Sequence, residues 1–425
     1  MFDFANQAYT LLIITVVFGD LFTTVIVGDR GDDYRLGNLL WSLSLATSYL
    51  MVVLSAPLLG AIMDYSAARK QFLFASYMVT VVATAMLYFV EPGWIVLACA
   101  LVILSNYAYA AGESFIASFL PDLAPRERLG RISGLGWALG YVGGLFAAGF
   151  TLVFLGEVSR ENYDTIRWVG PFAGGFFLVA AIPTFLWLRE RRQGQALPSG
   201  QTYFRVGLQR IAATVRDLGY YRDLALMLCS IFFTMAGIFI IISFAFIYGA
   251  QVIGWDEHVR ALMFIVVQIT AVAGALFFGL RQHRIGARRT YIITLTLWLF
   301  AILAIYATPQ VSRALQVVAG IDVEAQYVFL VAGCLAGLSL GSAQSAGRAL
   351  VGMMAPRNKA AETFGFWGVA GRLAAVFGLV GLGALQAVFG LQPAILFCML
   401  LFAVAIAIAL TVNVERGMAH AERPE

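Results

Sequence analysis

Twelve long apolar stretches, separated by short polar ones, fill almost the whole chain. A bilayer core about 30 Å thick is crossed by roughly 20 apolar residues in a helix, and each stretch is long enough. Backbone groups in lipid must be bonded within their own segment, so we expect helices. The predicted spans are residues 4–28, 38–63, 71–90, 94–120, 132–156, 168–188, 223–248, 259–280, 290–307, 326–350, 363–387 and 393–413. The pattern predicts an all-α membrane protein with twelve transmembrane helices and leaves no room for a soluble catalytic domain.

One polar and basic segment, residues 189–222, interrupts this rhythm. It divides the chain into a six-helix bundle over residues 1–188 and a second bundle with a short tail over residues 223–425. The part of the linker after Pro198 is interpreted either as a short amphipathic helix on the inner membrane surface or as a solvated linker.

The amino-acid composition argues against several classes of function. The 425 residues are 61% hydrophobic and 12% charged, and the net charge of +4 is too small to indicate a nucleic-acid partner. All four cysteines fall inside apolar spans without metal-ligand spacing, so we expect no metal site, disulfide framework or cofactor. No nucleotide-binding loop or HExxH motif occurs, which argues against direct ATP drive and against an enzyme. The first apolar run lacks a basic leader and a cleavage site, so we expect it to be retained as a helix.

Basic residues predict the orientation. With the N-terminus inside, the inner loops and tail hold 20 Lys and Arg, and the outer loops hold six. Cytoplasmic loops carry such an excess, so both termini are predicted to be cytoplasmic. We expect a multi-pass protein of the plasma (bacterial inner) membrane, monomeric, with the bilayer, a small solute and protons as its partners.

An internal repeat links the two halves. The loops after the second and eighth spans carry a glycine, a polar residue four positions later and a basic pair at a constant offset of 219. These residues are Gly60, Asp64, Arg69 and Lys70 in the first loop and Gly279, His283, Arg288 and Arg289 in the second. Duplicated transporter halves place their substrate site at the interface of the repeats.

Both loops resemble the signature loop of the major facilitator superfamily, G-x-x-x-D-R-x-G-R-R. The first keeps the acidic residue, Asp64, whereas the second has His283 there, which would make that loop sensitive to pH. In this family the loop network holds one conformation and breaks in the other. The resemblance therefore implies a gating role for the eight loop residues, and positive-inside topology alone would not explain their repeated spacing.

More specific motifs resemble the Atg22-like effluxers and their bacterial UMF1 relatives. The matching segments are residues 3–9, 120–122 with 130–144, Gln344 with Arg348, and 362–366. The family's usual Asn, Ser and Lys are replaced by Ala117, Gly347 and Arg372. The resemblance implies a transporter, and the yeast member is linked to amino-acid efflux.

Charged residues within the spans are the first candidates for chemistry, because an ionisable group in lipid costs roughly 2.5–3.5 kcal/mol. Asp20 is interpreted as a proton acceptor or as a solvated group near the outer mouth. Glu113 and Arg348 are predicted to pair across the halves and close an inner gate, or else to pair within their own halves. Arg372 is expected to bind a substrate carboxylate or to partner Glu362.

Uncharged polar residues in the spans are weaker candidates, because each could line a cavity or bond to a neighbouring helix. They are Asn6, Asn106, Tyr107, Gln268 and Gln344.

Two functions from different classes follow. The first is a secondary active transporter that moves a small polar solute by alternating access and is coupled to protons through Asp20 or Glu113. The second is a receptor or scaffold with a transporter-like fold that no longer transports. Ala117 and Gly347 favour the second, whereas Glu113, Arg348 and the two gating loops favour the first.

Overall fold

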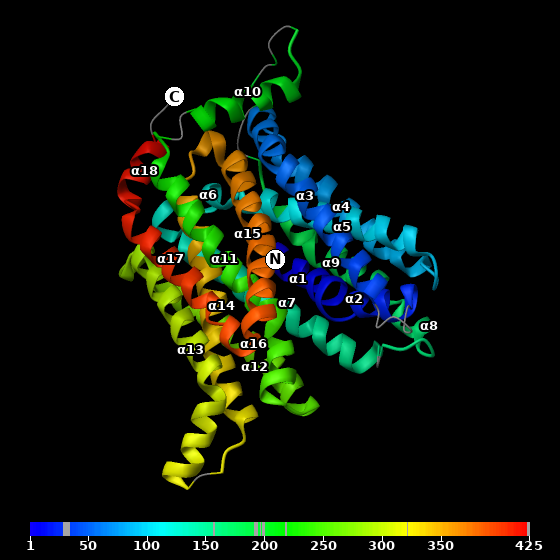
Figure 1. Ribbon diagram of the computed structural model, residues 1–425. Helices are drawn as coiled ribbons and strands as arrows, with labels where there is room; N and C mark the ends of the chain where they lie inside the picture. The colour runs from blue at the N-terminus through cyan, green and yellow to red at the C-terminus, as the bar shows by residue number, and fades with distance from the viewer. Residues whose placement is uncertain are drawn as a thin grey trace. The chain divides into compact units, whose positions relative to one another are not determined.

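The computed structural model describes residues 1–28, 35–155, 158–190, 194–195, 197, 200–216, 219–320 and 322–422. Within these ranges the regular structure is helical, without strands, and twelve helical segments are long and apolar enough to cross a membrane (Figure 1). The predicted all-α membrane fold with twelve transmembrane helices is thereby confirmed. Arg30, Arg191, Arg192 and Arg423, which contribute to the predicted charge asymmetry, lie outside the described residues.

The first half of the chain contains more breaks than the hydrophobic pattern suggests. Its elements are α1 (Phe2–Tyr9), η1 (Thr10–Val16), α2 (Phe18–Leu21), η2 (Phe22–Val27), α3 (Arg35–Ser66), α4 (Arg69–Met86), η4 (Leu87–Phe89), α5 (Ile95–Ala117), α6 (Leu120–Leu123), η5 (Arg126–Arg128), α7 (Leu129–Phe150), η6 (Thr151–Leu155), α8 (Tyr163–Ile166), α9 (Val169–Trp187) and α10 (Tyr203–Arg216). The linker therefore includes a helix, α10.

The second half is built from longer uninterrupted helices. Its elements are α11 (Arg222–Tyr248), η7 (Gly249–Ile253), α12 (Glu257–Ile285), α13 (Ala287–Ala319), α14 (Ala325–Met354), η8 (Arg357–Lys359), α15 (Ala360–Phe389), α16 (Leu391–Ala394), α17 (Phe397–Thr411) and α18 (Val414–Glu422). α13 extends twelve residues beyond the predicted span 290–307 and contains Pro309.

The first membrane-crossing segment is not a regular α-helix. Two π-helical stretches, η1 and η2, flank the short α2, and the Val17 amide bonds to the Leu12 carbonyl five residues earlier. Such bulges are rare and frequently lie at functional sites. Here they change which side chains share a face along the segment that carries Asn6, Thr10 and Asp20.

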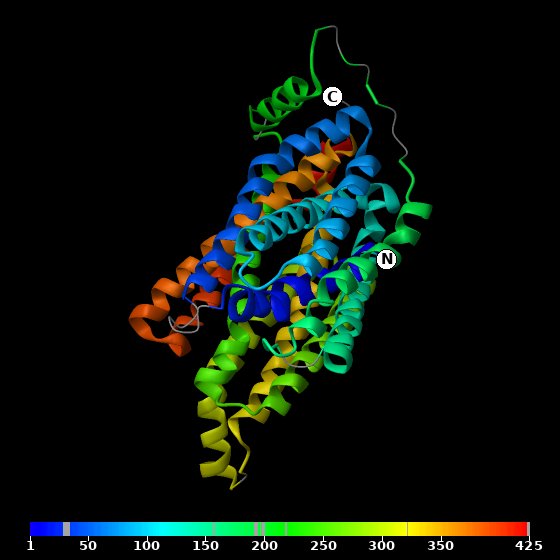
Figure 2. The ribbon, with the colours of Figure 1, turned by 90° about the vertical axis from the view of Figure 1, so that its right-hand side faces the viewer.

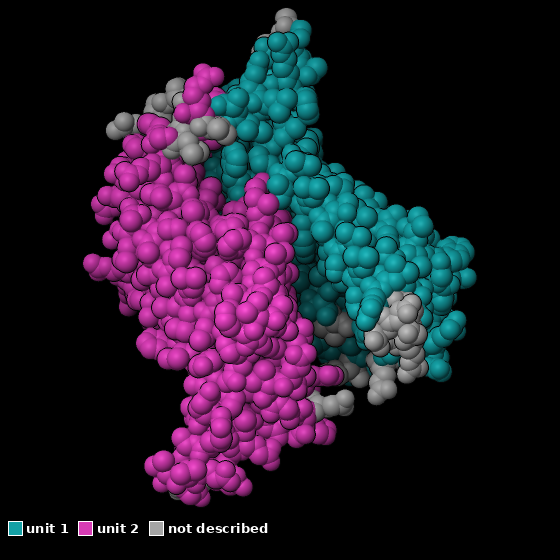
Figure 3. All heavy atoms as spheres, in the orientation of Figure 1, with its two compact units in different colours: residues 1–119, 139–212, 358–368 teal, residues 120–138, 213–357, 369–425 magenta. Residues whose placement is uncertain are grey.

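Two compact units make up the fold, and they do not coincide fully with the sequence halves (Figure 3). Unit 1 comprises residues 1–119, 139–212 and 358–368, and unit 2 comprises residues 120–138, 213–357 and 369–425. The start of α7 therefore belongs with helices of the second half, and the start of α15 belongs with helices of the first. The predicted domain division at 189–222 stays a prediction.

Each unit has its own apolar core. In unit 1, Phe2 packs edge-on against Phe177 at 5.3 Å between ring centroids, joining α1 to α9. In unit 2, the fully buried ring of Trp298 stacks on Phe402 at 5.1 Å, joining α13 to α17. Aromatic packing of this kind fixes the helices that carry the polar residues described next.

Candidate functional site

A buried polar cluster in unit 1 surrounds Glu113 on α5. The Tyr109 hydroxyl donates to the Glu113 carboxylate at 3.1 Å, and the Asn6 amide approaches the same oxygen at 3.5 Å. The Asn6 amide also donates to the Tyr109 hydroxyl at 3.3 Å, and that hydroxyl lies 2.6 Å from the Thr10 hydroxyl. Residues of the first and fourth membrane segments are thus joined around one carboxylate.

The cluster can change its proton arrangement without moving its heavy atoms. A phenol carries one proton, so while Tyr109 donates to Glu113 it must accept from Thr10. Protonation of Glu113 would allow its carboxyl group to donate to Tyr109, which would then donate to Thr10. The side-chain oxygen of Asn6, Oδ1, is buried without a hydrogen-bond partner and is a further acceptor beside this chain of hydrogen bonds. The hydrogen bonds of this cluster can therefore run in either direction.

Tyr109 is the centre of this cluster, and the sequence analysis did not select it. Its ring stacks on Tyr9 at 4.6 Å between centroids, and the Tyr9 hydroxyl lies 2.9 Å from that of Ser105. The available signal was its position four residues before Glu113, which places both on one helical face.

Asp20 lies apart from this cluster, in the short α2. Its side chain is exposed, and the hydroxyls of Thr23 and Thr24 donate to its backbone carbonyl at 3.1 and 2.8 Å. These bonds stabilise the break between α2 and η2 and leave the carboxylate uninvolved. A proton-accepting role for Asp20 stays a prediction.

The uncharged candidates differ in their contacts. The Asn106 amide donates to the Ser48 hydroxyl at 2.6 Å, and the Tyr107 hydroxyl lies 3.0 Å from that of Ser55. Both bonds join α5 to α3, as the interhelical alternative predicts. Gln268 on α12 and Gln344 on α14 are half-buried.

Arg348 on α14 is buried in unit 2 and reaches the start of α7. Its guanidinium donates to the Ser133 hydroxyl at 3.1 Å and to the Ser133 carbonyl at 3.2 Å, and it lies 5.3 Å from the Trp137 ring centroid. The Ser133 hydroxyl in turn donates to the Ser345 carbonyl at 2.8 Å. Arg348 therefore contacts the first sequence half through its fifth membrane segment. Glu113 belongs to unit 1, and the predicted pair of Glu113 with Arg348 stays a prediction.

Arg372 and Glu362 cannot partner each other as one alternative expected. Both lie in the continuous helix α15, ten residues apart, which corresponds to about 15 Å along the helix axis. Glu362 is instead buried with its carboxylate 3.9 Å from the Arg210 guanidinium of α10. A substrate role for Arg372, which is half-buried, stays a prediction.

The first gating loop is anchored by its acidic and first basic residues. The buried Asp64 carboxylate accepts the backbone N–H of Glu362 at 2.9 Å, at the beginning of α15, where a negative charge is favourable. The fully buried Arg69 pairs with Glu190 at 2.7 Å and donates to the Ser118 carbonyl at 3.0 Å. Lys70 lines a cavity of about 440 Å³ together with Glu190.

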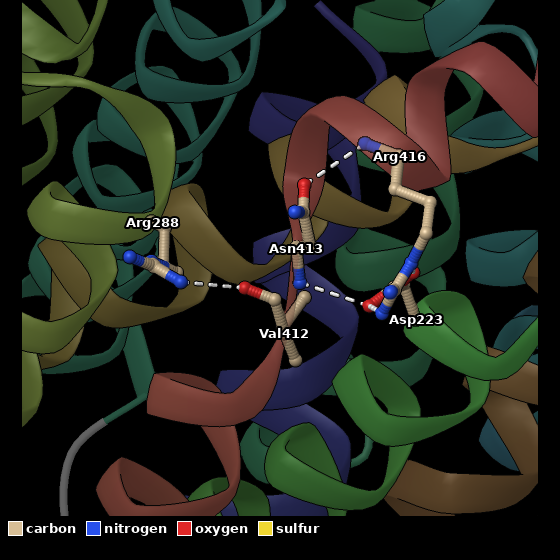
Figure 4. A network of polar contacts seen from close by, with 5 residues as sticks. All are labelled: Asp223, Arg288, Val412, Asn413 and Arg416. Atoms are coloured by element: carbon tan, nitrogen blue, oxygen red, sulfur yellow. Dashed lines mark hydrogen bonds and ion pairs between the residues drawn. The ribbon is translucent and has the colours of Figure 1, made fainter.

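The second gating loop is more open. Arg288, the repeat counterpart of Arg69, donates to the Val412 carbonyl at 2.7 Å, just beyond α17 (Figure 4). Each of these arginines therefore holds the segment that follows the sixth membrane helix of its own half. His283 and Arg289 are exposed.

The glycines of the two gating loops lie at equivalent helix crossings, and this is the most specific similarity between the repeats. In unit 1, a Cβ added at Gly60 would collide with the Ala361 carbonyl, and one added at Gly365 would lie 2.6 Å from the Ala56 carbonyl oxygen. In unit 2, a Cβ at Gly279 would lie 2.8 Å from the Gly134 Cα atom. α3 thus meets the start of α15 backbone to backbone, and α12 meets the start of α7 in the same way.

The tail helix α18 is fastened to α11, within unit 2, by a second polar network (Figure 4). The Arg416 guanidinium binds both oxygens of the buried Asp223 carboxylate at 2.6 and 2.9 Å, and the backbone N–H of Asn413 donates to Asp223 at 2.8 Å. These bonds raise the pKa of Arg416, so its charge is retained at any ordinary pH. Arg126 donates to the Met418 carbonyl at 2.7 Å and so connects α18 to η5.

Comparison with known proteins adds family evidence to this geometry. The model of the family described as "Vacuole effluxer Atg22 like" matches residues 43–422. The MFS-type transporter YxiO of Bacillus subtilis (strain 168) is 23% identical over 383 residues, which are 89% of this chain and 85% of that protein. Autophagy-related protein 22-1 of Aspergillus niger is 22% identical over 294 residues, 68% of this chain and 48% of that protein. The chain thus spans about half the length of such fungal relatives.

Solved structures with the same fold include the proton:xylose symporter XylE bound to 6-bromo-6-deoxy-D-glucose, with a TM-score of 0.70 and 14% identity over 97% of this chain and 94% of that one. The human organic anion transporter MFSD10 (TETRAN) has a TM-score of 0.69 and 16% identity over 96% of this chain and 98% of that one. At these identities the likeness shows the fold. The similar proteins are transporters and not enzymes.

Proposed function

The chain belongs to the family of Atg22-like vacuole effluxers, a branch of the major facilitator superfamily, and on that premise we propose that it is a secondary transporter moving a small polar solute by alternating access. An amino acid or related metabolite is the proposed cargo, on the family resemblance. From this fold we expect a lipid bilayer around the protein and a small molecule as its substrate.

The proposal of alternating access rests on the repeated glycine contacts. Two equivalent crossings, α3 with the start of α15 and α12 with the start of α7, join helices from opposite sequence halves at their basic-loop ends. Small residues at such crossings allow close approach without interlocking side chains, so the helices can separate and meet again. We assign these crossings to an inner gate, which is closed where the helices are in contact.

The excess of basic residues supports placing that gate in the cytoplasm. With 20 Lys and Arg predicted on the side of both termini and six on the other, the gating loops and linker face the inner compartment. The plasma membrane is the proposed location.

Proton coupling is assigned to the Glu113 cluster. The Glu113 carboxylate accepts from Tyr109 and is approached by Asn6, and the Thr10–Tyr109 chain of hydrogen bonds can run in either direction. A change of charge at a half-buried membrane site is a means of coupling conformation to a proton gradient.

Flux measurements test this function. Purified protein in proteoliposomes would be offered a panel of radiolabelled amino acids in counterflow, then with and without an imposed pH gradient. We expect saturable flux of at least one solute, stimulated by the gradient, and Glu113→Gln should retain counterflow but lose the stimulation. The matched control is Glu91→Gln, an exposed acid between membrane segments. Binding of a solute without any flux would instead indicate a receptor, and equal flux at all gradients in both proteins would reject proton coupling.

A further inference from the structure

The linker helix α10 has three chemically distinct faces. Its protein-facing side is formed by the buried Val206 and Gly207, together with Arg210. A second side is apolar and exposed, and a third carries arginine and glutamine. Helices with this division of faces commonly lie in the plane of a membrane surface.

The contacts on the protein-facing side indicate the depth of α10 relative to the end of the membrane-spanning helix α3. A Cβ added at Gly207 would lie 2.8 Å from Leu58 Cδ1 and 3.0 Å from Ile62 Cγ1, so α10 rests directly on α3 (Figure 2). Ile62 is four residues before the end of that membrane-spanning helix at Ser66, about 6 Å along its axis. α10 therefore lies beside the last turns of a transmembrane segment, at the level expected for lipid headgroups.

None of the described residues covers the apolar side of α10. The side chains of Phe204 and Leu208 are 58% and 47% exposed, one helical turn apart, and Ile211 continues the same stripe. Exposed aromatic and aliphatic groups on a helix at this depth are suited to the boundary between headgroups and acyl chains.

The charge on α10 has a single sign. The helix carries Arg205, Arg210 and Arg216 and no acidic residue. Arg205 and Arg216 are exposed, whereas Arg210 is turned to the protein. Basic residues beside an inserted apolar stripe attract anionic phospholipids.

We propose that α10 is a lipid-binding helix, which inserts Phe204 and Leu208 into the membrane and holds anionic phospholipid headgroups with Arg205 and Arg216. Arg210 transmits this binding to the start of α15: its guanidinium donates to the Asn358 carbonyl at 3.0 Å and lies 3.9 Å from Glu362. The Glu362 amide is the group that Asp64 binds. Anionic lipid thus stabilises the α3–α15 crossing, and its effect on transport rests on the proposed function.

Depth measurements test the insertion of α10. Nitroxide labels would be placed singly at positions 204, 208 and 209 in a variant without the four native cysteines, in nanodiscs of phosphatidylcholine with one quarter phosphatidylglycerol. Labels at 204 and 208 should be accessible to oxygen and protected from a water-soluble nickel chelate. The label at Gln209, on the basic side, is the control and should be accessible to nickel. Equal nickel access at all three positions, or protection of 204 and 208 from both reagents by a protein partner, would overturn the proposal.

Lipid selectivity tests the arginines without any transport assay. Protein purified from vesicles of the same composition would be analysed by native mass spectrometry for retained phosphatidylglycerol relative to phosphatidylcholine. R205Q/R216Q should lower this ratio, on the order of fivefold for each arginine removed, the effect of one basic residue near an anionic surface. R160Q/R313Q removes two exposed arginines elsewhere and should leave the ratio unchanged. Equal ratios in all three proteins would refute anionic-lipid binding by α10.

A third variant tests the role of Arg210 separately from lipid binding by Arg205 and Arg216. R210Q should keep the lipid ratio, because its side chain faces the protein, but should abolish the increase in melting temperature that phosphatidylglycerol gives the wild-type protein. If phosphatidylglycerol stabilises R210Q as much as the wild type, transmission through Arg210 is wrong. If lipid selectivity holds while no solute is transported, the proposed function fails and the lipid site stands.

Discussion

Gly134 packs directly against the backbone of Ala275: a Cβ atom at Gly134 would lie 2.6 Å from the Ala275 carbonyl oxygen. The repeat reproduces this contact between Gly365 and Ala56, also at 2.6 Å. Ala275 and Ala56 are 219 residues apart, the offset of the two gating loops. One crossing therefore occurs twice, once in each compact unit, and each joins helices from opposite halves of the sequence.

Gly134→Val should force the α7–α12 crossing apart. The atoms nearest to the new side chain are backbone atoms of Ala275 and Gly279, which cannot swing away as a flexible side chain could. Ser345, now 1% exposed beneath the start of α7, should become accessible. In a variant without native cysteines but with Ser345→Cys, alkylation by N-ethylmaleimide should be about tenfold faster than without the valine, which corresponds to a shift of 1.4 kcal/mol in the opening equilibrium.

The control for this change lies on the same helix. Gly149 has open space where its Cβ would be, so Gly149→Val adds the same β-branched side chain to α7 without a collision. It should leave alkylation at position 345 unchanged. Equal acceleration by both valines would mean that helix propensity, and not the crossing, controls the access.

Tyr109→Phe should uncouple flux from the pH gradient. The change keeps the ring stacked on Tyr9 but removes the hydroxyl that joins Thr10, Asn6 and Glu113. A lost hydrogen bond to a buried polar group costs about 1–3 kcal/mol, so a modest fall in melting temperature is also expected. Flux stimulated by the gradient, relative to counterflow, is the measurement.

Tyr107→Phe controls for the loss of a hydroxyl on the same helix. Its hydroxyl bonds to Ser55 and takes no part in the Glu113 cluster. This variant should keep the response to the gradient. Undiminished stimulation in Tyr109→Phe would argue that the cluster is structural.

Asp64→Ala should weaken the α3–α15 crossing. It removes the acceptor of the Glu362 amide and the negative charge at the beginning of α15, where a favourable charge contributes about 0.3–1 kcal/mol and the lost bond about 1–3 kcal/mol. Asp64→Asn keeps an acceptor and should have a smaller effect. Melting temperature in nanodiscs should fall in the order wild type, Asn, Ala, and an equal fall for both variants would assign the effect to charge alone.

Arg416→Gln should release the tail helix α18. The variant loses both bonds to Asp223, and limited digestion with a glutamate-specific endoproteinase should then cut after Glu415 faster, whereas Arg289→Gln, an exposed arginine of the second gating loop, should have no effect. A group whose pKa is raised by folding stabilises the fold below its unfolded value and loses that effect only above its folded value. Because the pKa of Arg416 is raised from an already high value, its charge contributes equally between about pH 6 and 9. Digestion of the wild-type tail that accelerated within this range would contradict a clamp made by Arg416.

Hydrophobic patterning alone predicts the twelve membrane segments, because each helix must bury its backbone within lipid whatever its neighbours are. It does not predict the π-helical breaks around Asp20, since a change from four- to five-residue bonding leaves no mark on an apolar run. The partners of Glu113 and Arg348 depend on which helices cross. Tyr109 is local and could have been selected by its spacing, whereas Ser133 is 215 residues from Arg348 and could not.

A disulfide across the α7–α14 contact is the most direct test of alternating access. Ser133 and Ser345 would be replaced by cysteine in a variant without native cysteines, because the Ser133 hydroxyl lies 2.8 Å from the Ser345 carbonyl. An inner gate that must open in every cycle predicts that oxidation stops solute flux in proteoliposomes, that a reductant restores it, and that each single cysteine variant is unaffected. Undiminished flux after complete cross-linking would contradict the gate.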